Sequence, residues 1–475
     1  MRLPLLEHNK MTYLDQDTIC AIATAPGCGG IAVARISGPS AIDIVQKIWQ
    51  GRKLADCQSH TAHLGNIIYP DNGTLLDQAV ATLYKAPHSY TGDDVVELAI
   101  HGSTWIQSEL LRVLIDSGAR MAEPGEFTRR AFTSGRMDLA EAEAVADLIE
   151  SQSAAAHRVA MNQMRGMFSQ RLEQLRESLL NLASLIELEL DFSEEEVEFA
   201  SREQLSLLSD DIYNELSSLT NSFANGSAIK NGIPVAIIGE TNAGKSTLLN
   251  RLLGEERAIV SDIHGTTRDT IEDTLSIHGT LYRLIDTAGL RETNDPIETI
   301  GITRAIEKAS HAKIVIWVID PTSSSSNLHD TAIRITSSLS PDSHLVVAVN
   351  KADIADTDMT NDIAKLIAPL QASILTISAA KGTGLEYLTN AIHEHSGAGD
   401  INENTVMVTN ARHYQALDAA RTSINRVRQG IQQNLSGDFI AQDLRETLHH
   451  LGTITGTITT PDILTHIFSH FCIGK

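Results

Sequence analysis

The chain has 475 residues, of which 42% are apolar and 20% are charged. This composition is ordinary for a globular protein of about three domains and excludes a disordered, collagen-like or disulfide-scaffold chain. Acidic residues outnumber basic residues by 60 to 37, giving a formal net charge of −23. Binding to nucleic acid would therefore need a local basic patch or a partner that carries the positive charge.

Cys20, Cys28, Cys57 and Cys472 form no Cys-x-x-Cys pair, so neither a zinc site nor a disulfide framework is expected. This cysteine usage fits a reducing compartment, and we expect a cytoplasmic protein. Charges interrupt residues 1–17, which excludes a signal peptide, and Met11 is an alternative start. No apolar run approaches the ~18 residues of a membrane span, so no membrane contact is expected.

Residues 17–124 predict an α+β domain. Short runs of β-forming composition, separated by Gly, Pro and Asn, lie at residues 18–24, 31–37, 77–84 and 94–102. Helices are expected near Ala41–Trp49 and Trp105–Ser117. The glycines before Ile31 indicate a tight turn between the first two strands, and Arg35 is the one charge on the second strand.

Two helical regions follow from composition and periodicity. No proline lies between Pro124 and Pro234, and apolar residues recur there every three or four positions, so Met137–Ser227 predicts a bundle of long antiparallel helices. After a polar linker that follows His395, residues 411–435 and Phe439–Lys475 are again helical, the latter with one Thr/Gly-rich break.

Between these regions the pattern alternates apolar strands with helices, which predicts a parallel sheet covered by helices. The expected strands are Val235–Ile238, Leu281–Ile285, Ile314–Ile319, Leu345–Val349 and Ile374–Ile377. Thr322–Ser326 reads as a short polar loop. The simplest arrangement is a helical domain in two pieces, near residues 130–230 and 400–475, with the α/β domain inserted between them.

The segment Gly239–Ser246, GETNAGKS, matches the P-loop pattern and lies between a predicted strand and a predicted helix. Lys245 is expected to reach the β- and γ-phosphates, and Ser246 to ligate Mg²⁺. A glycine-rich turn without a ligand would leave the Lys-Ser pair unexplained. The predicted phosphate-binding residues are Asn242, Ala243, Gly244, Lys245, Ser246 and Thr247.

Two further motifs complete the predicted phosphate and magnesium site. In DTAG, Asp286 is placed to hold a magnesium-bound water, and the Gly289 amide to meet the γ-phosphate. In GTTRD, Thr267 can complete the Mg²⁺ shell. The intervening residues Thr287 and Ala288 belong to the same predicted set.

The last two motifs predict which nucleotide base is bound. The Asp353 carboxylate of NKAD can accept hydrogen bonds from N1–H and the 2-amino group of guanine, which adenine lacks, so GTP and GDP are selected over adenine nucleotides. The Ala379 amide of SAAKG is expected to meet the guanine oxygen. The remaining predicted base-binding residues are Asn350, Lys351, Ser378 and Ala380.

Leu290 stands where Ras-like enzymes have a glutamine that orients the attacking water. Hydrolysis is therefore either very slow or served by another group, with Glu292 and Glu298 as nearby acceptors and Arg268 and Arg291 as candidate fingers.

The chain ends in FCIGK. Its apolar context favours Cys472 as a small buried side chain.

Taken together, the chain resembles the MnmE (TrmE) family of tRNA uridine-5-carboxymethylaminomethyl modification GTPases from about Asp17 to its end. The resemblance is carried by DTICAIATAPGCGGIAVARISGP, SYTGDDVVELAIHG, PGEFTRRAFTSGRMDLAEAEAVADLI, the nucleotide motifs and FCIGK. It implies an N-terminal α+β tetrahydrofolate-binding and dimerisation domain (1–130). It also implies a discontinuous α-helical domain (131–230 and 397–475) and an inserted Ras-like P-loop G domain (231–396).

The resemblance also implies the activity. Family members are potassium-dependent GTP hydrolases that act as homodimers in a heterotetramer with FAD-containing MnmG. The complex adds a carboxymethylaminomethyl or aminomethyl group to C5 of the wobble uridine of certain tRNAs, with 5-formyl- or methylene-tetrahydrofolate as one-carbon source. The alternative is a GTP-switched ribosome-assembly factor of the Era or Der type. Such factors need an RNA-binding module, for example one with a GXXG loop, and residues 400–475 contain no such loop.

Specific roles follow from the resemblance. Arg35, Glu97, Arg136 and Lys475 would contact the folate, and Asn242 would help to bind K⁺. The rest of the K⁺ shell would come from the loop formed by Ser261, Asp262, Ile263, His264, Gly265 and Thr266, of which Ser261, Ile263 and Thr266 are the expected ligands. Glu298 would position the attacking water, which answers the problem of Leu290. Cys472 is a catalytic candidate whose role is open.

Overall fold

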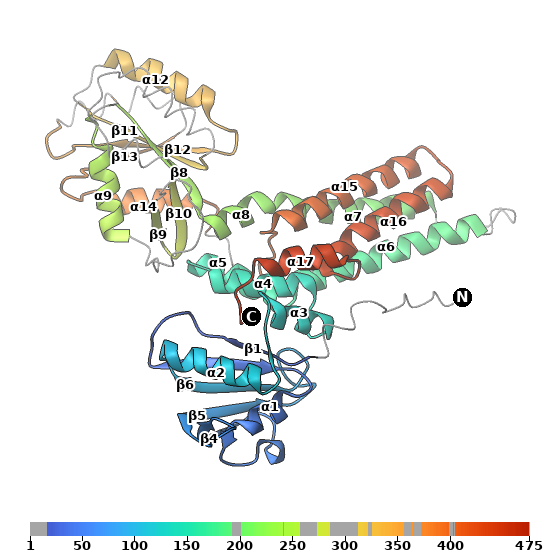
Figure 1. The fold of residues 1–475 in the computed structure, drawn as a ribbon. Helices are drawn as coiled ribbons and strands as arrows, with labels where there is room; N and C mark the ends of the chain where they lie inside the picture. The colour runs from blue at the N-terminus through green and yellow to red at the C-terminus, as the bar shows by residue number, and fades with distance from the viewer. Residues whose placement is uncertain are drawn as a thin grey trace. The chain divides into compact units, whose positions relative to one another are not determined.

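The computed structural model describes residues 17–191, 201–240, 242–256, 273–285, 312–321, 325–355, 363, 372–398, 402 and 404–474. The chain forms two compact units (Figure 1). Unit 1 combines Met1–Ala146 with Gly452–Lys475, and unit 2 is Asp147–Leu451. The predicted mixed fold of an α+β part, a helical bundle and a helix-covered parallel sheet is confirmed.

Unit 1 contains a seven-stranded sheet in the order β3-β4-β5-β6-β2-β1-β7. All neighbouring strands are antiparallel except β1 and β7. The strands are β1 Ile19–Ile22, β2 Ile31–Ser37, β3 Trp49–Gln50, β4 Thr61–Ile68, β5 Leu75–Tyr84, β6 Val95–His101 and β7 Arg120–Met121. The four predicted strand runs correspond to β1, β2, β5 and β6.

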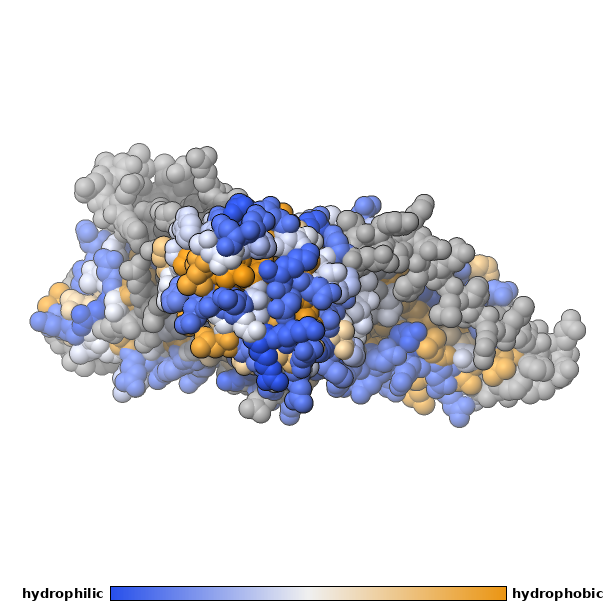
Figure 2. Space-filling model, turned by 60° about the horizontal axis from the view of Figure 1, so that its bottom comes forward, coloured by the Kyte–Doolittle hydropathy of each residue, from blue (hydrophilic) through white to orange (hydrophobic). Residues whose placement is uncertain are grey.

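One face of this sheet is covered by α1 (Ala41–Lys47) and α2 (Thr104–Asp116), and a short 3₁₀ helix spans Leu54–Asp56. Alternation of side chains along the strands sends Ile36, Leu98 and Leu114 of α2 into a shared core. The other face keeps Arg35 and Glu97 half-buried. Figure 2, in which the bottom of Figure 1 comes forward, shows apolar areas separated by hydrophilic ones.

Three helices complete unit 1: α3 (Glu126–Thr133), the first part of α4 (Leu139–Glu150) and α17 (Pro461–Ser469). Thr460 caps α17 by accepting a hydrogen bond from the Ile463 amide, and Pro461 occupies the first turn. Leu139, Leu464 and Phe468 pack in one apolar cluster. The last helix of the chain is therefore part of the same unit as the first strand.

Unit 2 contains the helical bundle and the second sheet. The bundle helices are α5 (Ala154–Met164), α6 (Met167–Asp191), α7 (Arg202–Asn221), α8 (Phe223–Asn231), α15 (Ala411–Gln432) and α16 (Gly437–Thr455). Ser201 and Gln204 form a capping box at the start of α7. Leucines spaced by three and four residues, such as Leu172, Leu175 and Leu179, are buried in the bundle. The predicted helical regions on both sides of the second sheet are thus confirmed.

The second sheet has the order β13-β12-β11-β8-β10-β9, and all its strands are parallel except β9. Its strands are β8 Ile233–Ile238, β9 Thr274–Ile277, β10 Thr280–Ile285, β11 Ile314–Ile319, β12 His344–Val349 and β13 Ser373–Thr376. Helices α9 (Lys245–Glu256) and α14 (Leu385–Glu394) share one core with the sheet, and α12 (Ser325–Ser338) shares another. The parallel sheet with helices in both cores matches the prediction.

Helix α5 joins the bundle to this sheet. The Ala155 amide donates to the carbonyl oxygen of Gly279, in the β9–β10 turn, at 3.0 Å. Ala155 and Val159 lie in the same apolar core as Leu275 of β9. The sheet and the bundle therefore share one core.

Two predictions about local structure are wrong. Of the polar loop expected at Thr322–Ser326, the last two residues belong to α12, which begins at Ser325, and residues 322–324 lie outside the described part of the chain. Cys472 is exposed, not buried, because α17 ends at Ser469 and Gly474, with a φ of 96°, turns the chain. Among the residues described, no helix is long and apolar enough to cross a membrane.

Candidate functional site

The predicted nucleotide-binding residues gather at one edge of the second sheet. Because β8, β11 and β12 are parallel, their carboxyl ends meet at this edge. Gly239 follows β8, Asp320 follows β11 and Asn350 follows β12. Strands β10 and β9 lie on one side of β8, whereas β11, β12 and β13 lie on the other. The boundary between β8 and β11 is therefore a topological switch point, the position at which open α/β sheets bind ligands.

The P-loop is shaped by two glycines that leave no room for a side chain. Gly239 has a φ of 149°, and a Cβ there would lie 2.3 Å from the carbonyl oxygen of Val318. Gly244 has a φ of 96°, and its Cβ would lie 2.2 Å from Nδ2 of Asn350. The loop then enters α9 at Lys245. Backbone amides followed by a helix N-terminus form a phosphate-binding arrangement.

Lys245 points back over this loop. Its Nζ donates to the carbonyl oxygens of Gly239 at 2.7 Å and Glu240 at 2.6 Å. Burial lowers the pKa of Lys245, partly opposed by the charge of Glu240. An anionic phosphate placed in the loop would offer this ammonium a stronger acceptor than either carbonyl.

Asn350 connects the P-loop to the predicted base-binding loop. Its Nδ2 donates to the Ala243 carbonyl at 2.8 Å, and its Oδ1 accepts from the Ala379 amide at 2.9 Å. Asn350 is only 3% exposed, so both hydrogen bonds are shielded from water. The Ala379 amide thus has a different partner from the guanine oxygen predicted for it, and the next residue, Ala380, is exposed.

Asp353 is fixed by the neighbouring loop. The Ser378 hydroxyl donates to Asp353 Oδ1 at 2.6 Å. This hydrogen bond lowers the pKa of Asp353, so the carboxylate is an acceptor at neutral pH. Lys351 forms an ion pair with Asp320 at 2.5 Å. The carboxylate predicted to recognise guanine is therefore ionised and oriented.

Several predicted site residues lie outside the described part of the chain. They are Ser261, Asp262, Ile263, His264, Gly265, Thr266, Thr267, Asp286, Thr287, Ala288, Gly289, Glu298 and Lys475.

A second candidate site lies in unit 1. Arg35 and Glu97 are paired in register between β2 and β6. Arg35 donates from Nε to Glu97 Oε1 at 2.9 Å, and its Nη2 forms an ion pair with the same oxygen at 2.8 Å. Nη1 of Arg35 also donates to the Gly474 carbonyl at 3.4 Å. A Cβ on Gly474 would lie 2.4 Å from the Ile22 carbonyl oxygen, so the tail is packed against β1. The end of the chain therefore reaches Arg35 within a single chain.

Aromatic rings border the Arg35 guanidinium. Its carbon lies 5.4 Å from the ring centre of Tyr90 and 5.7 Å from that of Phe127. Burial raises the pKa of Tyr90 and, together with the charge of Glu97, that of Tyr84. Arg136, the fourth predicted folate contact, is exposed and lies beside Gly92.

The sequence analysis did not single out four residues in or near this site. Tyr90 and Phe127 place their rings beside the Arg35 guanidinium, and Glu126 and Arg130 form an ion pair on the helix that carries Phe127. The adjacent charges of Glu126, Arg129 and Arg130 after Pro124-Gly125 were the available signal. Among the described residues, no group of three or more His, Cys, Asp or Glu side chains could hold a metal ion.

Known protein families match the parts of the chain that contain both candidate sites. A model of the MnmE helical domain matches residues 139–472, and one described as the GTP-binding protein TrmE N-terminus matches residues 18–136. The tRNA modification GTPase MnmE of Bacteroides thetaiotaomicron is 48% identical over 469 residues, covering 97% of this chain and all of that protein. The protein of the same name from Parabacteroides distasonis is 49% identical, covering 96% of this chain and all of the relative.

Two solved structures are also similar. A GTP-binding protein from Sulfolobus solfataricus in complex with GDP gives a TM-score of 0.27 at 19% identity, covering 50% of this chain and 71% of that one. The G domain of the Thermotoga maritima FeoB iron transporter gives a TM-score of 0.25 at 25% identity, covering 34% and 98%.

Proposed function

The chain belongs to the MnmE family of tRNA modification GTPases and is a GTP hydrolase of tRNA modification; from this premise we propose that it modifies C5 of the wobble uridine. It would add a carboxymethylaminomethyl or aminomethyl group in a potassium-dependent cycle, together with an FAD-containing MnmG partner. Tetrahydrofolate carrying a formyl or methylene group would supply the one-carbon unit.

The observation that carries the nucleotide part of this proposal is the contact set of Asn350. One buried side chain joins the phosphate loop at Ala243 to the base loop at Ala379. With Asp353 held as a carboxylate by Ser378, this edge of the sheet offers acceptors that suit guanine and amides that suit phosphates.

Metal ions fit the donors of the phosphate loop. The Ser246 hydroxyl stands in the first turn of α9, directly after Lys245, and would hold Mg²⁺ with Thr267 and Asp286. Asn242, an exposed residue of the loop with a φ of 62°, would hold K⁺ with the segment from Ser261 to Thr266. These ions would neutralise charge that develops on the phosphates. Glu298 would position the water that Leu290 cannot.

The charged groups of the Arg35 site suit a folate. The Glu97 carboxylate suits the amidine-like edge of a pterin, and the cationic groups suit the anionic glutamate tail. The carbonyl of Gly474 on Arg35 brings Cys472 into the same neighbourhood, and Cys472 is exposed. Arg136 and Lys475 would add further positive charge. The proposal therefore places the one-carbon donor in unit 1.

Homodimerisation through unit 1 is supported by two exposed apolar side chains on the sheet face that carries Arg35. Ile31 is 69% exposed and Leu64 is 66% exposed, which is unusual for large apolar side chains on a sheet. The formal charge of −23 means that tRNA would be contacted through a local basic patch or through a partner that carries the positive charge.

The test is nucleoside analysis of total tRNA from cells that lack this chain, with the intact gene restored as control. We expect C5-modified wobble uridines to disappear and to return on complementation. If every modified wobble uridine persists, the proposed modification is wrong. Loss of ribosomal subunits with intact tRNA modification would instead favour an assembly factor.

A further inference from the structure

Helix α3 and the residue that precedes it contact both the C-terminal tail and Arg35. At its start, the Gly125 amide donates to the Cys472 carbonyl at 3.4 Å. Gly125 has a φ of 66°, and a Cβ there would lie 2.7 Å from the Phe468 carbonyl oxygen. Two residues later, the Phe127 ring borders the Arg35 guanidinium. One turn of helix therefore contacts the C-terminal tail and Arg35 together.

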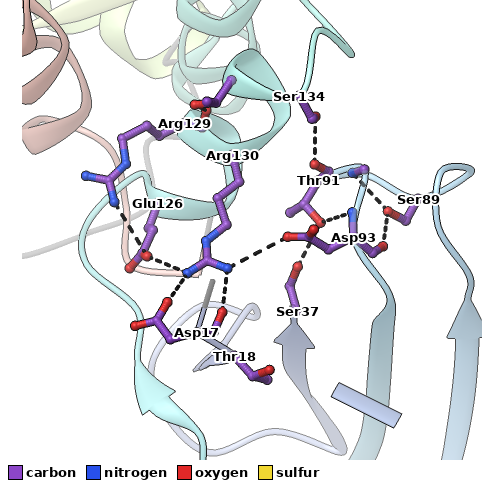
Figure 3. A network of polar contacts seen from close by, with 12 residues as sticks. Asp17, Thr18, Ser37, Ser89, Thr91, Asp93, Glu126, Arg129, Arg130 and Ser134 are labelled. Carbon is purple, nitrogen blue, oxygen red and sulfur yellow. Dashed lines mark hydrogen bonds and ion pairs between the residues drawn. The ribbon is translucent and has the colours of Figure 1, made fainter. Parts of the chain in front are cut away.

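A network of charges anchors this turn (Figure 3). Glu126 is fully buried and accepts hydrogen bonds from Arg120 at 2.7 Å, from Arg130 at 3.0 Å and from the Glu123 amide at 2.8 Å. Arg130, 3% exposed, also donates to the carboxylate and the carbonyl of Asp17 at 2.6 and 2.8 Å.

The network ties α3 to elements that are distant in the sequence. Asp17 directly precedes Thr18 and β1, and Arg120 belongs to β7. Asp93, just before β6, lies 3.7 Å from Arg130. The helix is thus fixed against the strands that flank Arg35, with its rotation set by directional contacts.

Stability alone is a poor reason for this arrangement. A buried ion pair is often no more stabilising than apolar residues of the same volume, because desolvation offsets the attraction. What such a network provides is a single geometry for the helix that carries it. Here that helix holds Gly125 against the tail and Phe127 against Arg35.

We infer that Glu126 and Arg130 are positioning residues for the Arg35 site: they fix α3 so that the C-terminal tail and the Arg35 guanidinium meet. The identity of the ligand as a reduced folate rests on the proposed function. The positioning of the tail does not, and it can be measured separately.

The experiment uses the full chain with Cys28, the other exposed cysteine, replaced by serine. Two variants are compared. Glu126→Gln removes the central charge, and Gly125→Ala disturbs the tail contact while leaving every charge of the network in place. Arg112→Gln, which breaks an exposed ion pair with Glu109 in the same unit, is the control. A spin label on Cys472 reports tail mobility. Binding of 5-formyl-tetrahydrofolate, GTP turnover and melting temperature are recorded on the same proteins without the label.

We expect both variants to mobilise the label and to weaken folate binding by about tenfold or more, because small displacements of a binding group have large effects. GTP turnover should stay unchanged, and the control should resemble the starting protein. An immobile label and unchanged folate affinity in folded variants would overturn the inference. If Glu126→Gln does not fold, Glu126→Asp, which keeps the charge and shortens the side chain, is measured in its place.

The two proposals fail separately. If the starting protein binds no folate, the folate assignment is wrong, and a label mobilised by both variants still supports the positioning role. If folate binds equally to all proteins and the label does not change, the positioning role is wrong and the folate site stands.

Discussion

The hydroxyl of Ser378 donates a hydrogen bond to Asp353 Oδ1, with 2.6 Å between the two oxygens. This contact joins the two motifs expected at the guanine base and lowers the pKa of Asp353. A carboxylate that is both ionised and oriented can accept hydrogen bonds from N1–H and the 2-amino group of guanine, a pair of donors that adenine lacks.

Asp353→Asn should therefore lower affinity for GDP and raise affinity for the xanthine analogue XDP. Each lost charge-assisted hydrogen bond is worth roughly 1.5–3 kcal/mol, or about 10- to 100-fold in affinity. Competition binding with GDP, XDP and ADP measures the change. Ser378→Ala is the matched control, since it removes the orienting contact and keeps the carboxylate, and should weaken GDP without favouring XDP. Equal affinity of the unmodified chain for ADP and GDP would contradict the guanine assignment.

Replacing Asn350 by alanine should separate the two nucleotide loops. The change leaves the Ala243 carbonyl and the Ala379 amide without their partner, and each buried unpaired group costs about 1–3 kcal/mol. We expect faster hydrogen exchange of the Ala379 amide and weaker GDP binding. Asn390→Ala, on α14, removes a hydrogen bond with His278 of the β9–β10 turn and should leave both unchanged. GDP affinity that survives Asn350→Ala would show that the bridge is dispensable.

GTP turnover should be faster in KCl than in NaCl at matched ionic strength, because Na⁺ is too small for a shell built from Asn242 and a loop of carbonyl oxygens. Glu298→Ala should be slow in both salts if Glu298 positions the attacking water. Identical rates in the two salts would reject the role of K⁺. Full activity of Glu298→Ala would reject Glu298 and leave the potassium role intact.

Deleting Cys472–Lys475 should abolish folate binding and tRNA modification. The deletion removes the Gly474 carbonyl from Arg35 but keeps Phe468 and Phe471, the apolar residues that anchor this end of the chain. Melting temperature and GTP turnover should therefore be preserved. Folate binding that persists, or global unfolding, would mean that the tail has no direct place in the site.

Acid should weaken unit 1 through the α3 network. Burial alone would raise the pKa of Glu126, but hydrogen bonds from Arg120, the Glu123 amide and Arg130 hold the pKa below its ordinary value of 4.5. The same balance with Arg120 and Arg130 lowers the pKa of Asp17 from 3.8. A lowered folded-state pKa contributes stability that is present above the unfolded value and is lost as pH falls through the folded value.

Urea unfolding of the unmodified chain and Glu126→Gln from pH 7 to pH 3 tests this. The advantage of the unmodified chain should be constant near neutrality and shrink below about pH 4.5, because a protonated glutamate resembles glutamine. A difference that stays constant down to pH 3 would contradict a charged Glu126.

Strong local patterns made much of the fold predictable. Ile314–Ile319 is continuously apolar, as expected of a strand buried on both faces of a parallel sheet. The sequence analysis missed β4, whose run contains Gly65 and Asn66, and β9, which has only four residues. Both are held mainly by pairing with neighbouring strands, which local composition does not report.

The site residues also fall into those that local motifs predict and those that depend on contacts between distant parts of the chain. Lys245, Asn350 and Asp353 belong to motifs whose spacing carries their chemistry, and the structure brings them to one sheet edge. The contact between Arg120 and Asp17 joins residues 103 positions apart, and no periodicity signals it. Cys472 was misjudged because its apolar neighbours suggested a continuing helix, whereas α17 ends at Ser469 and the chain then packs Gly474 against Ile22.

The composition of unit 1 has a consequence during synthesis. Its two pieces, Met1–Ala146 and Gly452–Lys475, are separated by the whole of unit 2. At ribosomal rates of about 5–20 residues per second, roughly 15 to 60 seconds pass between the emergence of the first piece and the last. During that interval Gly125 and Arg35 lack their C-terminal partners, while β8 to β13 can already assemble. The GTPase part of the nascent chain is thus able to form before the Arg35 site is complete, and a chain truncated near its end would retain the first and lack the second.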